Sequence, residues 1–169
     1  MFIRKVIYAW VYIVRLLSLK RLFKFAREVY YETDTGALDG VDVVAYFTQQ
    51  EMVKGSRDHT VLWQGSTWYF SCDQHRKLFL EDPLSYAPQY GGFCAFGITE
   101  GLTVKPDPKS WSVVDGKLYL NYDEYTRTLW SRNNPLLIKE ANDYWQLQAT
   151  KSQKKVYTIK VDNPDVENT

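Results

Sequence analysis

The chain has few of the residues that mark specialised protein classes. Its 169 residues include two Cys, two His, six Pro and nine Gly. Two cysteines are too few for a disulfide scaffold, and 45% hydrophobic residues with little Pro and Gly exclude collagen-like repetition and a disordered chain. A net charge of +1 gives the whole chain no strong preference for nucleic acid. These absences leave one folded domain with appendages.

The common catalytic and cofactor motifs are also absent. The sequence has no phosphate-binding loop, no His-Glu-x-x-His and no Gly-x-Ser-x-Gly. Asp34-Thr35-Gly36 spells the aspartic-protease tripeptide, but Tyr31 and Glu32 precede it where an apolar strand is required, so we predict a turn. The tryptophan clusters have no basic residues between them, which favours core packing over stacking on nucleic acid. The sequence therefore favours a protein that is not an enzyme, without deciding the question.

The charge is distributed unevenly along the chain. Residues 1–30 have a net charge of +6, because Glu28 alone opposes seven basic residues: Arg4, Lys5, Arg15, Lys20, Arg21, Lys24 and Arg27. The remaining 139 residues therefore have a net charge of −5. The sequence thus predicts a basic arm followed by a mildly acidic body.

The arm has the patterns of a segment that associates with membranes. Residues 6–14 are apolar without interruption, a run shorter than the roughly 18 residues that a spanning helix needs. Residues 16–30 place apolar residues three and four apart and basic residues on another face, as in helices that lie on anionic membranes. We expect residues 1–32 to form a membrane-associating helix that contacts the membrane surface through residues 1–30. The alternative is a helix packed on its own domain.

The arm gives weaker evidence for the cellular compartment of the body than for membrane association. Arg4 and Lys5 before an apolar run are typical of a signal peptide, but no cleavage site follows. More basic residues lie after the run than before it, which favours the cytoplasmic side and leaves export open.

Residues 33–149 predict an α+β body in which two β-hairpins and short helices surround one core. Residues 33–40 are rich in Asp, Thr and Gly and predict a linker, and residues 41–47 predict a strand. Residues 86–97 contain Pro, paired Gly and aromatics and predict an ordered, buried loop. The tail, residues 150–169, is polar, although residues 156–161 alternate as an edge strand does.

Two hairpins are expected from their turn residues. Gly65-Ser66 predicts a turn that places Trp63 opposite Trp68 and His59 opposite Cys72. Asp115-Gly116 predicts a second turn, with Trp111 opposite Leu120, Ser112 opposite Tyr119 and Val113 opposite Leu118.

Three helices are expected in the body. Ser71 and Gln74 have the spacing of a capping box, and Asp82-Pro83 predicts the end of that helix. Two more helices are expected over residues 123–131 and 135–148, the second capped by Asn134.

The candidate metal ligands are Cys72, His75, Cys94 and His59. Cys72 and His75 are three residues apart at a helix start and therefore point the same way. The predicted hairpin brings His59 opposite Cys72, and Cys94 could approach through the Gly91-Gly92 turn. Two thiolates and two imidazoles suit a zinc or copper ion.

The same residues have other interpretations. A buried free Cys packs as a small apolar group, so the cysteines and histidines could be structural. Cys72 in a first helical turn beside His75 could be a reactive thiol, although no orienting acid can be named from the sequence. Cys72 and Cys94 could also form a thiol-redox or small-ligand site, or a disulfide if the body is exported.

The stretch from Trp68 to Tyr86 resembles the YHS domain family. That family has a Tyr-Phe pair, a His or Cys a few residues later, a Phe and then Pro-x-x-Tyr; the matching residues are Tyr69, Phe70, His75, Phe79, Pro83 and Tyr86. Residues 36–47, 86–95 and 111–122 are similar to further blocks of a longer bacterial subgroup whose members are often exported or membrane-linked. The resemblance covers about residues 36–147.

The resemblance implies a small, zinc-ribbon-like α+β module that binds a metal ion, usually suggested to be copper. Within this sequence, only His75 falls on a position suspected of binding metal in that family. Ser71 stands where the family has a Cys after the Tyr-Phe pair, and Cys72 follows one place later. The family resemblance therefore indicates one ligand and leaves the rest of the site open.

Overall fold

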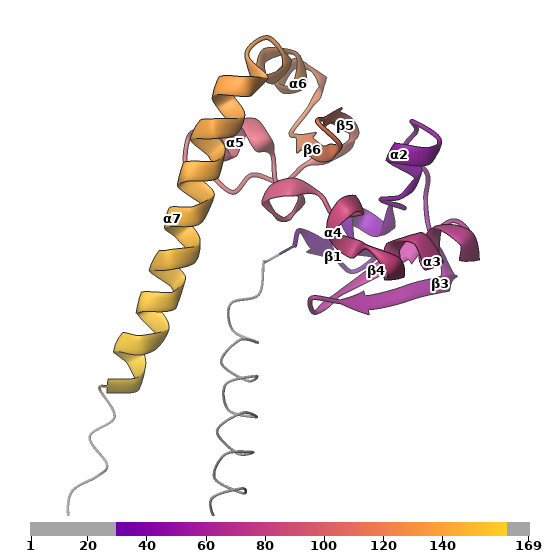
Figure 1. The fold of residues 1–169 in the computed structure, drawn as a ribbon, viewed down its shortest axis with the longest axis horizontal. Helices are drawn as coiled ribbons and strands as arrows, with labels where there is room; N and C mark the ends of the chain where they lie inside the picture. Colours follow the sequence, from indigo (N-terminus) through magenta and orange to yellow (C-terminus); the bar gives the residue numbers. More distant parts are fainter. Residues whose placement is uncertain (1–29, 162–169) are drawn as a thin grey trace, which may run out of the picture. The chain divides into compact units, whose positions relative to one another are not determined.

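The computed structural model describes the backbone of residues 30–161 and the side chains of residues 30–147. The predicted membrane-associating arm, apart from Tyr30 to Glu32, lies outside the described residues. The fold is α+β, as predicted, with three two-stranded antiparallel hairpins (Figure 1). The strands are β1 (Glu32–Thr33), β2 (Gly36–Ala37), β3 (Ser56–Trp63), β4 (Ser66–Phe70), β5 (Asp107–Val114) and β6 (Lys117–Asn121). The helices are η1 (Leu38–Gly40), α2 (Ala45–Thr48), α3 (Asp73–Glu81), α4 (Pro83–Tyr86), η2 (Gln89–Gly92), α5 (Ala95–Thr99), α6 (Glu124–Ser131) and α7 (Asn134–Val161).

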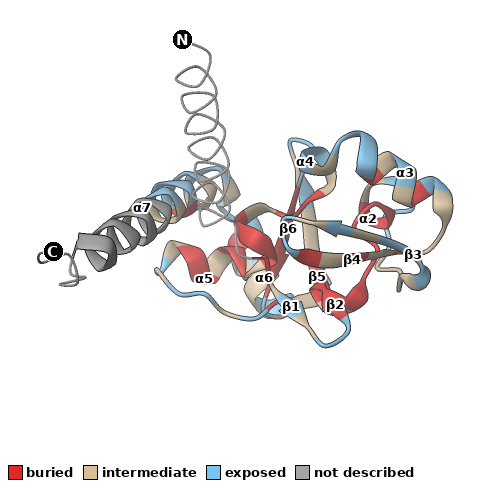
Figure 2. Ribbon diagram, turned by 90° about the horizontal axis from the view of Figure 1, so that it is seen from below, coloured by how far each residue is buried: buried red, intermediate tan, exposed pale blue. Residues whose placement is uncertain are grey.

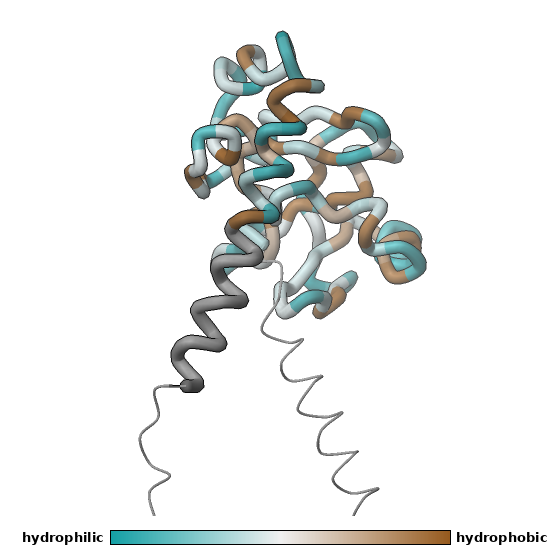
Figure 3. The backbone as a smooth tube through the Cα atoms, turned by 60° about the vertical axis from the view of Figure 1, so that its left-hand side comes forward, coloured by the Kyte–Doolittle hydropathy of each residue, from teal (hydrophilic) through white to brown (hydrophobic). Residues whose placement is uncertain are grey.

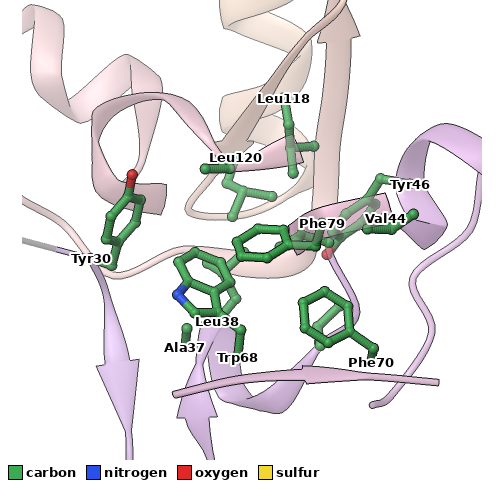
Figure 4. Close-up of a cluster of buried hydrophobic side chains, with 13 residues drawn as sticks. Tyr30, Ala37, Leu38, Val44, Tyr46, Trp68, Phe70, Phe79, Leu118 and Leu120 are labelled. Carbon is green, nitrogen blue, oxygen red and sulfur yellow. The ribbon is translucent and has the colours of Figure 1, made fainter. Parts of the chain in front are cut away.

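Strand β6 lies between two clusters of buried side chains. Leu118 and Leu120 belong to the first cluster, which also contains Trp68, Phe70 and Phe79 (Figure 4). The second cluster contains the β6 side chain between those leucines, together with residues of α5, α6 and α7: Tyr119, Ala95, Ile98, Trp130 and Ala141. Both faces of β6 are therefore buried, which explains why its sequence is apolar at consecutive positions.

The first hairpin shows how burial follows the strand period. Along β4, Ser66, Trp68 and Phe70 are buried while the residues between them are half-buried. Most of β3 is exposed or half-buried (Figure 2). The hairpin thus contributes chiefly the β4 side chains to the core.

Residues 33–40 are not a linker, contrary to the sequence-based expectation. Strands β1 and β2 pair around the turn at Asp34 and Thr35, which confirms the predicted turn. Ala37 and Leu38 follow directly and are fully buried in the first cluster. Gly36 has φ +100°, and a Cβ there would lie 2.4 Å from the Tyr69 ring, so the close approach to β4 requires glycine.

The predicted register of the first hairpin is wrong. The turn is Gln64-Gly65, with φ of 50° and 83°, so Trp63 pairs with Ser66 and Val61 pairs with Trp68. Two consecutive residues with positive φ form the turn whose twist matches that of the strands. The rings of Trp63 and Trp68 still lie on one face, 6.0 Å apart between centroids.

A second error of register follows further along β3. The ladder is irregular between Ser56 and Thr60, and His59 falls inside that irregularity. The predicted pairing of His59 with Cys72 is therefore not formed. By contrast, every predicted pair of the second hairpin is present: Trp111 with Leu120, Ser112 with Tyr119, and Val113 with Leu118.

Residues 41–47 do not form the predicted strand. Val41 makes one isolated bridge to Lys54, and the chain then turns into α2. The cause is Asp42, whose Oδ1 accepts the backbone N–H groups of Val44 and Ala45 at 3.0 and 3.3 Å. An aspartate that binds N–H groups two and three residues ahead favours helical over extended backbone.

The predicted helices are present with shifted ends. Helix α3 has Cys72 rather than Ser71 at its N-cap, without a side-chain capping bond, and it ends before Asp82-Pro83 as expected. Asp123 caps α6 by accepting the Thr126 N–H. Helix α7 continues to Val161, so the strand expected at residues 156–161 is not formed.

The predicted loop at residues 86–97 is buried but contains the short helices η2 and α5. Hydrophobic stretches of the described chain are short and interrupted by hydrophilic residues (Figure 3). Between residues 30 and 161, no helix is both apolar enough and long enough to traverse a bilayer.

Candidate functional site

A buried aspartate–histidine pair joins α2 and α3. Nδ1 of His75 lies 2.7 Å from Oδ2 of Asp42, and the two side chains are 8% and 0% exposed. His75 occupies the first turn of α3, and Asp42 precedes α2 by three residues. A carboxylate at this distance fixes Nδ1 as the protonated ring nitrogen.

Four further donors bind the Asp42 carboxylate in addition to His75. Its Oδ2 also accepts the backbone N–H of Ser71 at 2.8 Å and the Ser71 hydroxyl at 2.7 Å. Its Oδ1 accepts two N–H groups at the start of α2. Five donors therefore surround one carboxylate, which compensates for its complete removal from solvent.

The second ring nitrogen of His75 points toward the protein surface. Its Nε2 lies 3.0 Å from Oγ1 of Thr48, an exposed residue at the end of α2. Thr48 Oγ1 also lies 3.1 Å from the carbonyl of Val44, to which it can donate. The arrangement runs from a buried carboxylate through an imidazole to the hydroxyl of an exposed threonine.

This order of groups has two chemical uses. A His with Nδ1 held by a carboxylate presents Nε2 as a metal ligand in many metalloproteins. Carboxylate, imidazole and hydroxyl in this order also form hydrolase triads, but those need N–H groups aimed at the reacting oxygen. The backbone N–H groups of Thr48 and Gln49 donate to the carbonyls of Val44 and Ala45, so neither is available for that role.

The four predicted metal ligands are not assembled into one site. Cys72 is the half-buried N-cap of α3 and His75 lies in the first turn of that helix, while His59 lies in β3. Within residues 30–147, no group of three His, Cys, Asp or Glu side chains is close enough to hold a metal ion.

Cys94 lies in a separate polar environment. Its side chain caps α5 by accepting the Gly97 N–H at 3.4 Å, and its thiol lies 3.9 Å from Oδ1 of Asn121. Asn121 Oδ1 also accepts the Phe96 N–H, whereas its Nδ2 has no partner among the described residues. Both cysteines are free in the structure, so no Cys72–Cys94 disulfide is formed.

Sequence reasoning missed the three residues that surround His75: Asp42, Ser71 and Thr48. A signal for the first was present, because a charged residue inside the apolar run at 41–47 must be paired if the run is buried. The orienting acid that could not be named from the sequence is this aspartate. No local pattern links it to His75, which is 33 residues away.

The residues of the Tyr-Phe-His pattern have distinct structural positions. Phe70 and Phe79 are fully buried and their rings lie 5.1 Å apart. Tyr86 packs edge-on against Phe47, and Pro83 begins α4. In contrast to these residues, His75 has ring nitrogens within hydrogen-bond distance of the side chains of Asp42 and Thr48.

Comparisons with protein-family models, with curated proteins and with solved structures found no match to this chain.

Proposed function

We propose that this chain is a YHS-like module, attached to a membrane through residues 1–30, that binds one metal ion through Nε2 of His75. The observation that carries the proposal is the 2.7 Å contact between His75 Nδ1 and the buried Asp42. A carboxylate behind an imidazole orients the ring and makes the other nitrogen a better ligand.

The composition of the site favours copper(I) over zinc. A structural zinc ion needs four protein ligands, and the described residues contain no group of three. Copper(I) is satisfied by fewer ligands when they are soft, and a thiolate is the softest that proteins supply. Cys72 is the N-cap of α3, three residues before His75, so we propose its thiol as the second ligand.

Thr48 provides the sharpest test of this proposal. Its hydroxyl lies 3.0 Å from Nε2 of His75, so a metal ion bound to that nitrogen must displace it. Thr48→Val removes that competitor without touching a proposed ligand. We expect tighter copper(I) binding by Thr48→Val and at least tenfold weaker binding by His75→Gln and by Cys72→Ser.

The measurement is a competition titration of the full chain against a chromophoric copper(I) chelator under reducing conditions. Asp143→Asn, an exposed substitution on α7, serves as the control and should bind as the parent chain does. Separate His59→Gln and Cys94→Ser variants show whether either residue completes the site. Equal affinity of the parent chain and His75→Gln would refute the proposal.

Membrane attachment is tested by fractionation. Tyr30 is buried against Trp63 and Trp68, so a truncated chain should begin at Glu28 to keep this packing. We expect the full chain in the membrane fraction and the truncated chain in the soluble fraction. Replacing Lys20, Arg21, Lys24 and Arg27 by Gln should weaken attachment to anionic vesicles. Equal solubility of both chains would contradict the proposal.

The Cys94 environment favours a thiol function as the second candidate. Its sulfur accepts the Gly97 N–H at 3.4 Å at the start of α5 and lies 3.9 Å from Oδ1 of Asn121. If thiol chemistry is the function, the metal-free chain should react with iodoacetamide at Cys94, as located by mass mapping of its peptides. A metal-free chain with an unreactive Cys94 would exclude this candidate.

A further inference from the structure

A cleft separate from His75 lies between the 84–91 segment and the first half of α7. Its volume is about 280 Å³, near the lower end of the range for small-ligand sites. Its lining includes Pro88, Gln89, Tyr90, Asn142 and Trp145.

Side-chain contacts join the two walls of the cleft. The Tyr90 hydroxyl donates to Oδ1 of Asn142 at 3.0 Å and lies 3.3 Å from the carbonyl of Ile138, which ties η2 to α7. Its ring packs against Trp145 with centroids 6.0 Å apart. Tyr90 itself has φ 55°, a conformation that few residues other than glycine adopt. Such a backbone outlier in a cleft is more frequent at ligand sites than elsewhere.

The chemistry of the cleft is polar and uncharged. Among the described residues, none that lines it is Asp, Glu, Lys, Arg or His. Burial, and to a smaller extent Tyr119, raises the pKa of Tyr90, so its hydroxyl stays protonated and keeps its bond to Asn142. That bond occupies Oδ1 of Asn142 and leaves its Nδ2 to donate, and Gln89 on the opposite wall adds a second side-chain amide.

These properties restrict the ligand. A charged ligand would lose its hydration without gaining a counter-charge. A lipid chain would leave the amides without partners. A neutral sugar ring has hydroxyls for the amides and a flat C–H face for the ring of Trp145, and one ring is of suitable size.

We propose that this cleft binds one ring of a neutral oligosaccharide, with Trp145 against the face of the ring and with Asn142 and Gln89 on its hydroxyls. The site does not involve His75 and is independent of the proposed metal function.

The test is isothermal titration calorimetry of the full chain with maltotriose, cellotriose and chitotriose. We expect at least one of these to bind with a Kd of about 1 mM or tighter. Trp145→Ala and Gln89→Ala should each weaken that binding at least tenfold. Tyr125→Ala removes an aromatic ring that is 72% exposed on α6 and should leave it unchanged.

Three results would overturn the proposal. The first is no binding of any of the three sugars. The second is binding that Trp145→Ala and Gln89→Ala leave unchanged, since two substitutions on opposite walls cannot both miss an occupied cleft. The third is tighter binding of the neutral peptide Ala-Pro-Pro-Pro-Ala than of every sugar, which would identify the cleft as a peptide site instead.

Discussion

Asp42 and His75 are 33 residues apart in sequence, yet Oδ2 of the first lies 2.7 Å from Nδ1 of the second. Both side chains are buried, and the same carboxylate oxygen also binds the backbone and hydroxyl of Ser71. One carboxylate therefore connects the end of the first hairpin, α3 and the start of α2.

Replacing Asp42 by Ala should strongly destabilise the protein. Five donors would lose their acceptor inside the core, and removal of one partner of a buried pair costs about 3–5 kcal/mol. Urea denaturation followed by circular dichroism measures this loss. Asp143→Ala on the exposed face of α7 should change the free energy of unfolding by less than about 0.5 kcal/mol. Similar stability of the two variants would show that the carboxylate is not a structural centre.

Gly55 should tolerate no side chain. A Cβ at this position would lie 2.4 Å from the backbone carbon of Tyr69, which β4 holds in place. Gly55→Ala should therefore lower the free energy of unfolding by about 3 kcal/mol or more. Gly116→Ala is the matched control, because nothing lies within 4 Å of its Cβ and only its φ of +72° is unfavourable, which costs about 1 kcal/mol. An equal or larger loss in Gly116→Ala would contradict the prediction.

The turn of the first hairpin can be tested at Gln64. Because Gln64 has φ 50°, Gln64→Asn should raise the free energy of unfolding by about 0.5 kcal/mol and Gln64→Val should lower it. If the turn were Gly65-Ser66, Gln64 would belong to a strand, where Val is preferred over Asn. Thermal unfolding of the two variants therefore distinguishes the two registers by the sign of the change.

Asp73 should make stability depend on pH in the acid range. Hydrogen bonds from Lys77 and then Arg76 lower the pKa of Asp73 from 3.8 to about 2 in the folded protein. A carboxyl with a lowered folded-state pKa stabilises above its unfolded pKa, and this contribution is lost as the pH falls from about 4 to 2. The difference in Tm between the parent chain and Asp73→Asn should therefore shrink over that range. A difference that stays constant from pH 5 to pH 2 would refute this assignment.

The sequence by itself determined the features that depend on neighbouring residues. Asp115-Gly116 places positive φ where a two-residue turn needs it, and alternation in the flanking strands leaves one register for the second hairpin. Asp123 and Pro135 gave the starts of α6 and α7 to within a residue or two for similar local reasons. The α+β class followed from the same separate blocks of strand and helix patterns.

Tertiary structure decided the rest. The predicted and observed registers of the first hairpin differ by two residues, so Trp63 and Trp68 stay on the same face in both and alternation cannot distinguish them. Within the apolar run at 41–47, Asp42 can be buried because its second carboxylate oxygen gains partners from Ser71 and His75, which only the folded chain brings together. The site around His75 depends on those long-range contacts. The local sequence determines which side chains carry hydrogen-bond donors and acceptors. Whether those groups lie within hydrogen-bond distance depends on the packing of all the elements between them.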